Sequence, residues 1–188
     1  RAGEPFALVG HSYGAAVALV AAFRPPRRVR ALALYEPTLF SLVDADSPPP
    51  NDADGIKGTV AAACTHLDAG DPERAAEQFI DFWMGRGSWA RMPEARKPPI
   101  VASMVNIGGW AHALMKEPTS LAAFRQLDVP VLYMTGSESP ASSLAVARLL
   151  TRTLPRVEVV EFKGLGHMAP VTHPEPVNEA IARFLERV

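Results

Sequence analysis

Short apolar runs alternate with helix-like segments near the start of the chain. Residues 6–10 (FALVG) and 29–37 (VRALALYEP) are nearly continuous apolar runs, a pattern typical of strands buried on both faces. Residues 13–23 between them are apolar on all sides, as in a helix buried against a sheet. A strand, a helix and a second strand in this order predict a βαβ unit and a parallel sheet.

The same alternation returns near the C-terminus. Residues 128–136 (DVPVLYMTG) and 157–162 (VEVVEF) have the pattern of strands, and residues 143–155 between them have that of a helix. Residues 173–188 form an amphipathic helical pattern that begins with a proline and an acidic residue. The fold class that these patterns predict is α/β, with a parallel sheet and flanking helices.

The middle of the chain separates these two parts. Residues 41–58 are rich in proline, aspartate and glycine, which predicts a loop or linker, and the pattern from there to residue 127 is helical with no convincing strand. We therefore expect three parts: residues 1–40 and 128–188 as the two portions of one α/β core, and residues 41–127 as a helical insertion.

Composition and charge narrow the possible partners. The chain has 188 residues, is 48% apolar and carries a formal charge of −1. A chain of this length can bury roughly 70% of its unfolded surface, which is enough for one domain with its own core. The near-neutral charge gives no indication of binding to nucleic acid or to an anionic membrane. The single cysteine, Cys64, excludes an internal disulfide and a multi-cysteine metal site. No uncharged apolar run is long enough to span a membrane. We expect a small-molecule partner and no metal.

A serine stands where the first strand-like run turns into a helix. Gly10-His11-Ser12-Tyr13-Gly14 fits the pattern G-x-S-x-G in its strand-turn-helix context, which predicts Ser12 as a nucleophile. The sharp turn brings the residues two positions away close together, so we expect both glycines to be needed. The helix beginning at Tyr13 directs its backbone N–H groups to the same point, so the Tyr13 N–H is a candidate oxyanion donor. His11 is expected to pack and to form hydrogen bonds.

A candidate base follows the last predicted strand. A serine needs a neighbouring base to attack at neutral pH, and His167 lies in a glycine loop after residues 157–162. Loops at the carboxyl ends of strands are where parallel α/β sheets build their sites. The sequence therefore predicts that His167 meets Ser12 in space.

Three stretches together resemble the α/β-hydrolase fold superfamily. LVGHSYGAAVAL is similar to its nucleophile elbow, VPVLYMTGSESP to the strand and loop after its insertion, and GLGHMAPVTHPEPVNEAIARFL to its catalytic-histidine loop and final helix. The resemblance implies a serine hydrolase without a metal or organic cofactor, in which Ser12 and His167 act together. It also implies that the helical insertion is a cap over the active site.

The acid of the expected triad departs from the family pattern. Most relatives carry an aspartate where this chain has Ser139, and Asp128 lies about 20 Å away at the other end of the strand, at roughly 3.3 Å per residue. Glu36 is the candidate we favour, because it ends the strand after the nucleophile strand, where the acid lies in some haloalkane dehalogenases. Glu138, one residue before the usual position, is the alternative.

The resemblance also implies strands ahead of the nucleophile. In the family, a loop after an early strand supplies the second oxyanion donor, whereas here the nucleophile strand begins near residue 6 and residue 1 is an arginine. We therefore expect the chain to resemble the C-terminal portion of a longer protein. No signal peptide is visible, which says nothing about export when residue 1 is not a methionine.

The function that we expect is serine hydrolysis by acyl transfer on a small apolar ester or related carbonyl compound. Aromatic residues of the insertion, among them Trp83 and Trp110, suggest an apolar pocket, with Met168 next to His167 as a further candidate; packing of the core explains the same residues equally well. The alternatives are a non-catalytic hydrolase-like binding module or inert fragment and, among enzymes, a carbon–carbon bond hydrolase or a cofactor-free haloperoxidase.

Overall fold

The sheet is parallel and has four strands in the described part of the chain. A computed structural model describes residues 5–24 and 28–188. The strands lie in the order β1-β2-β3-β4, and each neighbouring pair is parallel. They are β1 (Phe6–His11), β2 (Val29–Tyr35), β3 (Val131–Gly136) and β4 (Val157–Phe162). The predicted α/β class and all four predicted strands are confirmed.

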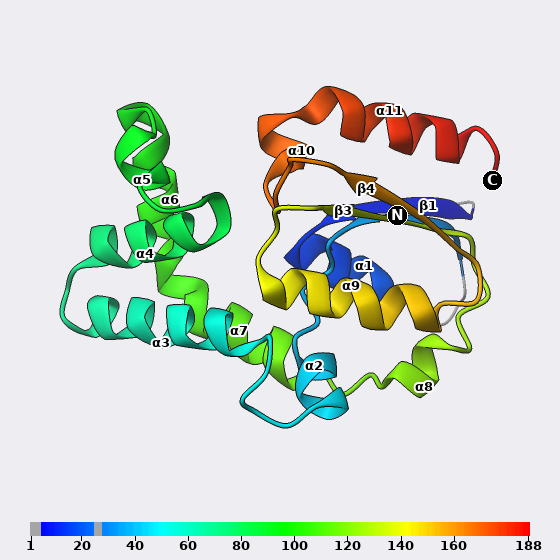
Figure 1. The fold of residues 1–188 in the computed structure, drawn as a ribbon, viewed down its shortest axis with the longest axis horizontal. Helices are drawn as coiled ribbons and strands as arrows, with labels where there is room; N and C mark the ends of the chain where they lie inside the picture. The colour runs from blue at the N-terminus through cyan, green and yellow to red at the C-terminus, as the bar shows by residue number, and fades with distance from the viewer. Residues whose placement is uncertain (1–4, 25–27) are drawn as a thin grey trace.

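Helices cover both faces of this sheet (Figure 1). On one face lie α1 (Tyr13–Ala21) and α9 (Ala141–Thr153), and on the other lie α10 (Ala169–Thr172) and α11 (Pro174–Leu185). Along β2, Leu32 and Leu34 belong to the cluster with α1 and α9, whereas Ala33 and Tyr35 belong to the cluster with α11. Successive side chains of a strand point to opposite faces, so a strand covered on both sides is apolar throughout.

The insertion between β2 and β3 is helical, and residues 58–127, all of which the structure describes, contain no strand. Its elements are α2 (Ser41–Asp46), α3 (Asp54–Asp68), α4 (Pro72–Met84), α5 (Ser88–Arg91), η1 (Glu94–Arg96), α6 (Lys97–Ser103), η2 (Met104–Asn106), α7 (Ile107–Lys116) and α8 (Leu121–Phe124). A small core of its own holds it together, built on residues such as Ala76, Met104 and Ile107. In residues 5–24 and 28–188, no helix combines the length and the apolar character needed to cross a bilayer.

The prediction of a loop over residues 41–58 is partly wrong. Helix α2 occupies its first residues and α3 begins at Asp54. Leu42 and Val43 are buried in the main core, so tertiary packing stabilises a helix that the local composition disfavours. Before α3, the side chain of Asn51 accepts a hydrogen bond from the Ala53 N–H (2.9 Å). Asparagine often stabilises a turn in this way, by binding the backbone two residues further on.

The first strand and helix are less buried than their apolar sequences predict. Val9 of β1 is 54% exposed and Val17 of α1 is 51% exposed. Among the described residues β1 pairs with β2 alone, so it lies at an edge of the sheet. The apolar character of residues 6–23 predicted the type of each element correctly, and Ala15, Ala16, Ala18 and Leu19 of α1 are buried as expected, whereas Val9 and Val17 are not.

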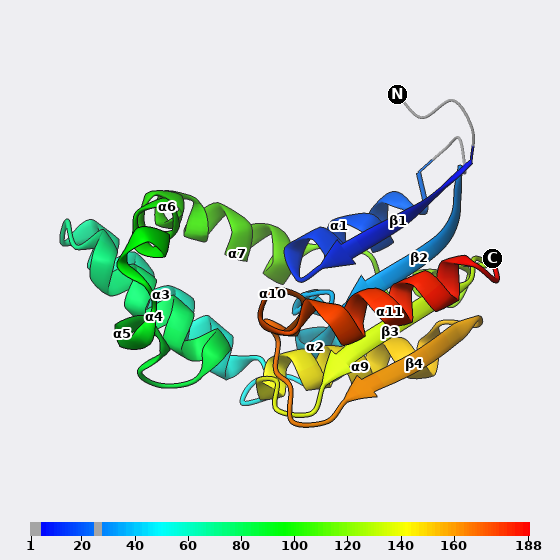
Figure 2. The same cartoon turned by 90° about the horizontal axis from the view of Figure 1, so that it is seen from above.

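The carboxyl ends of the four strands lie at one edge of the sheet, and this edge faces the insertion (Figure 2). Parallel pairing makes this unavoidable, because all strands run in the same direction. Ser12 follows β1, Glu36 follows β2, and the loop that carries His167 follows β4. Three residues far apart in the sequence are thus brought to the same edge.

Candidate active site

The turn between β1 and α1 holds Ser12 in an unusual backbone conformation. Ser12 has φ 56° and ψ −121°, and its N–H donates a hydrogen bond to the Tyr35 carbonyl (2.9 Å). In the part of the chain that the structure describes, only Ser12 and Glu36 (φ 45°) have a positive φ without being glycine. Such strained residues cluster at functional sites and persist only where their surroundings hold them.

The two glycines around Ser12 are not equivalent. A Cβ atom on Gly10 would lie 2.7 Å from backbone atoms of Ala15, much closer than real contacts. A Cβ on Gly14 meets no heavy atom within 4 Å in the described ranges. The expectation that crowding requires both glycines is right for Gly10 and wrong for Gly14, because the Gly14 Cα faces open space.

Ser12, His167 and Glu36 form a continuous chain of hydrogen bonds. The Ser12 hydroxyl donates to Nε2 of His167 (2.9 Å), and the Nδ1–H of His167 donates to Oε2 of Glu36 (2.6 Å). His167 is 1% exposed and Glu36 is fully buried. A buried carboxylate on one ring nitrogen holds the tautomer that leaves the other nitrogen free to accept a proton from serine.

The second oxygen of Glu36 is also saturated with hydrogen bonds. Its Oε1 accepts from the Thr135 hydroxyl (2.8 Å), the Gly136 N–H (2.7 Å) and the Ser139 hydroxyl (2.6 Å). Burial alone would raise the pKa of Glu36, but the hydrogen bond and charge of His167, with those from Ser139 and Gly136, hold this pKa below its usual value. The carboxyl group is therefore ionised and oriented at neutral pH.

The other acidic candidates lie elsewhere. Glu138 is exposed, and its backbone N–H donates to the Leu165 carbonyl (2.9 Å), so the structure places Glu36 and not Glu138 against His167. Asp128 lies at the amino end of β3, 3.5 Å from Arg156. In the sequence, Ser139 is noted only because it stands where most relatives have an aspartate. In the structure its hydroxyl donates a hydrogen bond to Glu36, and its position in the loop after β3 is the feature of the sequence that could have indicated this role.

His11 supports the histidine loop from the side. Its Nε2–H donates to the backbone carbonyl of His167 (2.8 Å), and its ring packs edge-on against Tyr35. Burial and the nearby His167 lower the pKa of His11 to about 4, so its ring is neutral at pH 7. This contact agrees with the packing and hydrogen-bonding role expected from the sequence.

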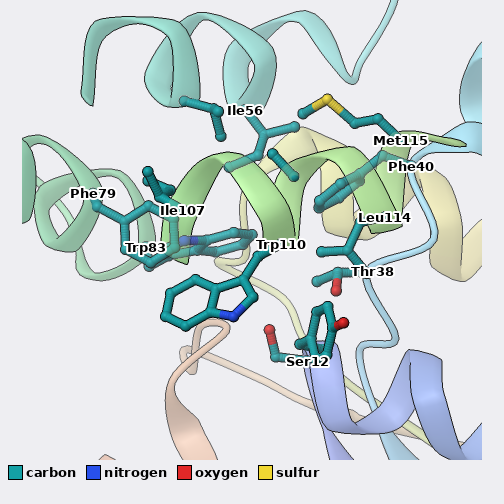
Figure 3. Close-up of a pocket in the computed structure, with 13 residues that line it drawn as sticks. Ser12, Thr38, Phe40, Ile56, Phe79, Trp83, Ile107, Trp110, Leu114 and Met115 are labelled. Atoms are coloured by element: carbon teal, nitrogen blue, oxygen red, sulfur yellow. The ribbon is translucent and has the colours of Figure 1, made fainter. Parts of the chain in front are cut away.

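A cavity of about 320 Å³ opens onto Ser12 (Figure 3). It is lined by Ser12, Tyr13, Thr38, Phe40, Ile56, Val60, Phe79, Trp83, Ile107, Trp110, Ala111, Leu114 and Met115. Trp83 and Trp110 line this cavity next to Ser12. Met168 instead lines a second cavity of about 390 Å³, together with Glu138 and Trp83.

Trp83 connects the insertion to the histidine. Its ring, on α4, stacks on that of His167 with centroids 4.1 Å apart and planes inclined by 29°. Phe79 and Phe82 pack edge-on against Trp83 and fix its orientation. The sequence indicated an aromatic insertion, but the pairing of these two rings depends on how the insertion folds back.

The start of α1 supplies a polar group beside the serine. Tyr13 is the first residue of this helix, and the first N–H groups of a helix have no acceptor within it. The Tyr13 N–H is therefore available next to Ser12 for a negatively charged oxygen. Within residues 5–24 and 28–188, no group of three or more His, Cys, Asp or Glu side chains is arranged to hold a metal ion.

Several solved structures share this fold. An α/β hydrolase from Sphaerobacter thermophilus is 26% identical (TM-score 0.66), with 97% of this chain and 68% of that chain covered. A thermophilic esterase from Thermogutta terrifontis is 23% identical (TM-score 0.70; 98% and 65% covered). The 2-hydroxy-6-oxo-6-phenylhexa-2,4-dienoate hydrolase of Rhodococcus sp. strain RHA1 is 18% identical (TM-score 0.70; 97% and 64% covered). The chain thus spans about two thirds of the length of these structures.

The sequence itself carries the family assignment. A search of curated proteins returned no match. The sequence model of the alpha/beta hydrolase fold matches residues 3–174, which include the serine turn, the helical insertion and the histidine loop. With its parallel sheet and its serine, histidine and acid at the strand ends, the chain belongs to the alpha/beta hydrolase fold family.

Proposed function

We propose that this chain carries the active site of a serine hydrolase that acts by acyl transfer on esters with a small apolar acyl group. The observation that carries the proposal is the hydrogen-bonded series from the Ser12 hydroxyl through His167 to Glu36. A serine is a weak nucleophile at neutral pH unless a base takes its proton, and the base needs a third group to orient it. These two contacts meet both requirements.

In the first step, Ser12 attacks the carbonyl carbon of the ester. Its proton passes to Nε2 of His167 over the existing 2.9 Å hydrogen bond, and the carbonyl oxygen becomes an oxyanion. The Tyr13 N–H stabilises this oxyanion. The ionised Glu36 stabilises the imidazolium through the 2.6 Å bond to Nδ1. When the tetrahedral intermediate collapses, His167 returns the proton to the leaving alcohol and an acyl-serine remains.

In the second step, water replaces the alcohol. His167 takes a proton from water as the water oxygen attacks the acyl carbon, and then protonates Ser12 as the acid product leaves. The strained backbone of Ser12 keeps its hydroxyl in place through both steps.

The pocket supports an apolar acyl group. Apart from Ser12, Tyr13 and Thr38, every lining residue is apolar, and the helices that supply them belong mainly to the insertion. Apolar walls with few polar groups are typical of sites for small organic ligands. In this proposal the insertion is the cap of the site and selects the acyl group. The esterase among the structural neighbours uses the same fold.

Labelling and turnover test the proposal together. A fluorophosphonate should label the chain at Ser12, and Ser12→Ala should abolish labelling and lower turnover of p-nitrophenyl hexanoate by at least about 10³. Ser47→Ala is the matched control, because Ser47 is exposed and lines a different pocket from the one that contains Ser12. Undiminished labelling in Ser12→Ala would exclude Ser12 as the nucleophile. Absent turnover and labelling in the parent chain would favour a non-catalytic binding module.

A further inference from the structure

One buried hydroxyl in the pocket has no protein partner. The Thr38 side chain is 1% exposed, and within residues 5–24 and 28–188 its Oγ1 forms no hydrogen bond. Thr38 lines the cavity that contains Ser12, and Figure 3 shows its hydroxyl oxygen turned toward the Ser12 end of that cavity. A buried polar group without a partner is unfavourable and is normally satisfied, so this one needs an explanation.

The local backbone holds Thr38 in this position. It follows Glu36 and Pro37 at the carboxyl end of β2, and its carbonyl accepts a hydrogen bond from the Phe40 N–H (3.1 Å). Phe40 is itself buried and lines the same cavity. Threonine is stiff about χ1, so the hydroxyl does not easily turn away from the pocket.

Thr38 is also unlike the other polar residues of the pocket. The Ser12 hydroxyl is engaged with His167, and the Tyr13 side chain is 39% exposed. The remaining lining side chains are apolar apart from the indole N–H groups of Trp83 and Trp110, which can donate a hydrogen bond but cannot accept one. In such a pocket one fixed hydroxyl, which can both donate and accept, selects ligands that place an oxygen against it.

We propose that Thr38 is a substrate-binding residue and that the pocket takes an apolar acyl group with one oxygen function (ether, hydroxyl or keto) a few bonds from the reacting carbonyl. The inference rests on the proposed function, because it places the acyl group of the substrate in this cavity. A volume of about 320 Å³ holds about ten methylene-sized groups at roughly 30 Å³ each, which sets the size of that acyl group.

Matched esters that differ in one atom test this. The p-nitrophenyl esters of hexanoate, propoxyacetate, 3-ethoxypropanoate and 4-methoxybutanoate have chains of equal length, with one methylene replaced by oxygen in the last three. Each kcat/KM is divided by the rate of hydrolysis by hydroxide, which removes intrinsic reactivity. We expect at least one oxygen-containing ester to exceed hexanoate by about tenfold, the value of one buried hydrogen bond.

The Thr38→Val variant keeps the shape of the side chain and removes the hydroxyl. Its ratio of oxygen-containing ester to hexanoate should fall by about tenfold, so that hexanoate becomes the equal or better substrate. Thr59→Val is the matched control, because Thr59 is buried, binds the Gly55 carbonyl of its own helix and does not line this pocket. An unchanged ratio in Thr38→Val, or no preference in the parent chain, overturns the proposal.

A binding measurement separates this proposal from the catalytic one. Heptan-2-one and three ketones with oxygen in place of a methylene that does not adjoin the carbonyl (1-propoxypropan-2-one, 4-ethoxybutan-2-one and 5-methoxypentan-2-one) cannot be hydrolysed. Their binding is followed by the fluorescence of Trp83 and Trp110 in the pocket. Tighter binding of one oxygen analogue that disappears in Thr38→Val supports the subsite even if no ester is turned over. Equal binding of all four ketones by the parent chain and by Thr38→Val overturns it.

Discussion

The Ser139 hydroxyl donates a 2.6 Å hydrogen bond to Oε1 of Glu36. Ser139 stands where the resemblance to α/β hydrolases implies an aspartate, and Glu36 stands two strands away in the sheet order from the β4 loop of His167. The carboxylate that faces His167 therefore directly follows β2, and the loop after β3 holds a hydrogen-bond donor to that carboxylate. Two carboxylates at this distance would repel each other, so a serine at position 139 is compatible with a carboxylate at position 36, whereas an aspartate there would not be.

Ser139→Asp should consequently impair the enzyme. A second carboxylate against Glu36 forces one of the pair to take up a proton, which weakens the charge facing His167. We expect kcat for p-nitrophenyl hexanoate at pH 7 to fall by about 10- to 100-fold, whereas Ser139→Thr, which keeps a hydroxyl, should retain most activity. Full activity of Ser139→Asp would show that the new aspartate replaces Glu36 in its role.

Glu36→Gln should preserve the fold and reduce the rate by up to about 10⁴, because an amide no longer holds the His167 tautomer that accepts a proton from Ser12. The matched control is Glu138→Gln, an exposed carboxylate in the neighbouring loop, which should change the rate little. Steady-state kinetics and a circular dichroism spectrum of each variant check this. The opposite result for the two variants would make Glu138 the acid.

The site could be predicted from the sequence where the signal is local. Ser12 and His167 each lie in a short pattern that follows a strand, and parallel strands bring their carboxyl ends together. Glu36 could be proposed on the same argument, because it directly follows β2. Each of these inferences needs only the strand ends, and strands of this kind are identified as short, continuous apolar runs bounded by turn residues.

The remaining features depend on contacts between distant segments. Nothing near Ser139 or Thr38 in the sequence indicates that the first binds Glu36 or that the second is buried without a partner. The stacking of Trp83 on His167 depends on how the insertion returns to the sheet. The local composition does not predict helix α2, because burial of Leu42 and Val43 outweighs the local propensity.

Trp83 should affect the chemical step. In the proposed mechanism His167 becomes positively charged in the transition state, and an aromatic ring whose centroid lies 4.1 Å from that of His167 would stabilise this charge. Trp83→Leu should lower kcat by about 2- to 30-fold, and Trp83→Phe should recover part of it. Trp110→Leu is the comparison, because Trp110 lines the same pocket and should act mainly on KM. A change confined to KM in Trp83→Leu would limit its role to the pocket wall.

His11 should make stability depend on pH. Its pKa is about 4 in the folded chain, against an ordinary value of 6.5, because burial and the facing His167 ring oppose a charged His11 ring. The hydrogen bond to the His167 carbonyl and the charge of Glu36 only partly offset these effects. Between these values the unfolded chain binds more protons, so the free energy of unfolding falls as pH drops from about 7 to about 4, by up to about 3 kcal/mol. From about pH 4.5, the ordinary pKa of a glutamate, downward, the depressed pKa of Glu36 adds a further loss of stability, because the unfolded chain takes up this proton first.

The His11→Gln variant isolates this contribution. An amide can still donate to the His167 carbonyl but does not titrate, so urea unfolding should give a clearly smaller slope between pH 7 and pH 4 than in the parent chain. Equal slopes in the two proteins would assign the pH dependence to other groups.

The two glycines around Ser12 should respond differently to the same substitution. Neither has a positive φ, so only the space around the new methyl group matters. In Gly10→Ala the Cβ would lie 2.7 Å from the Ala15 N and Cα and from the Gly14 carbonyl oxygen, all backbone atoms that cannot move without displacing the turn. We expect Gly10→Ala to lower the free energy of unfolding by at least about 2 kcal/mol and to reduce fluorophosphonate labelling, since the Ser12 hydroxyl moves with the turn.

In Gly14→Ala the methyl group meets open space in the first turn of α1, where alanine is favoured over glycine by up to about 1 kcal/mol. The stability of this variant should therefore be equal to that of the parent chain or higher, and labelling should be retained. Urea denaturation midpoints and labelling rates of the two variants, measured side by side, decide the matter. If Gly14→Ala were as damaging as Gly10→Ala, crowding would act on both sides of Ser12.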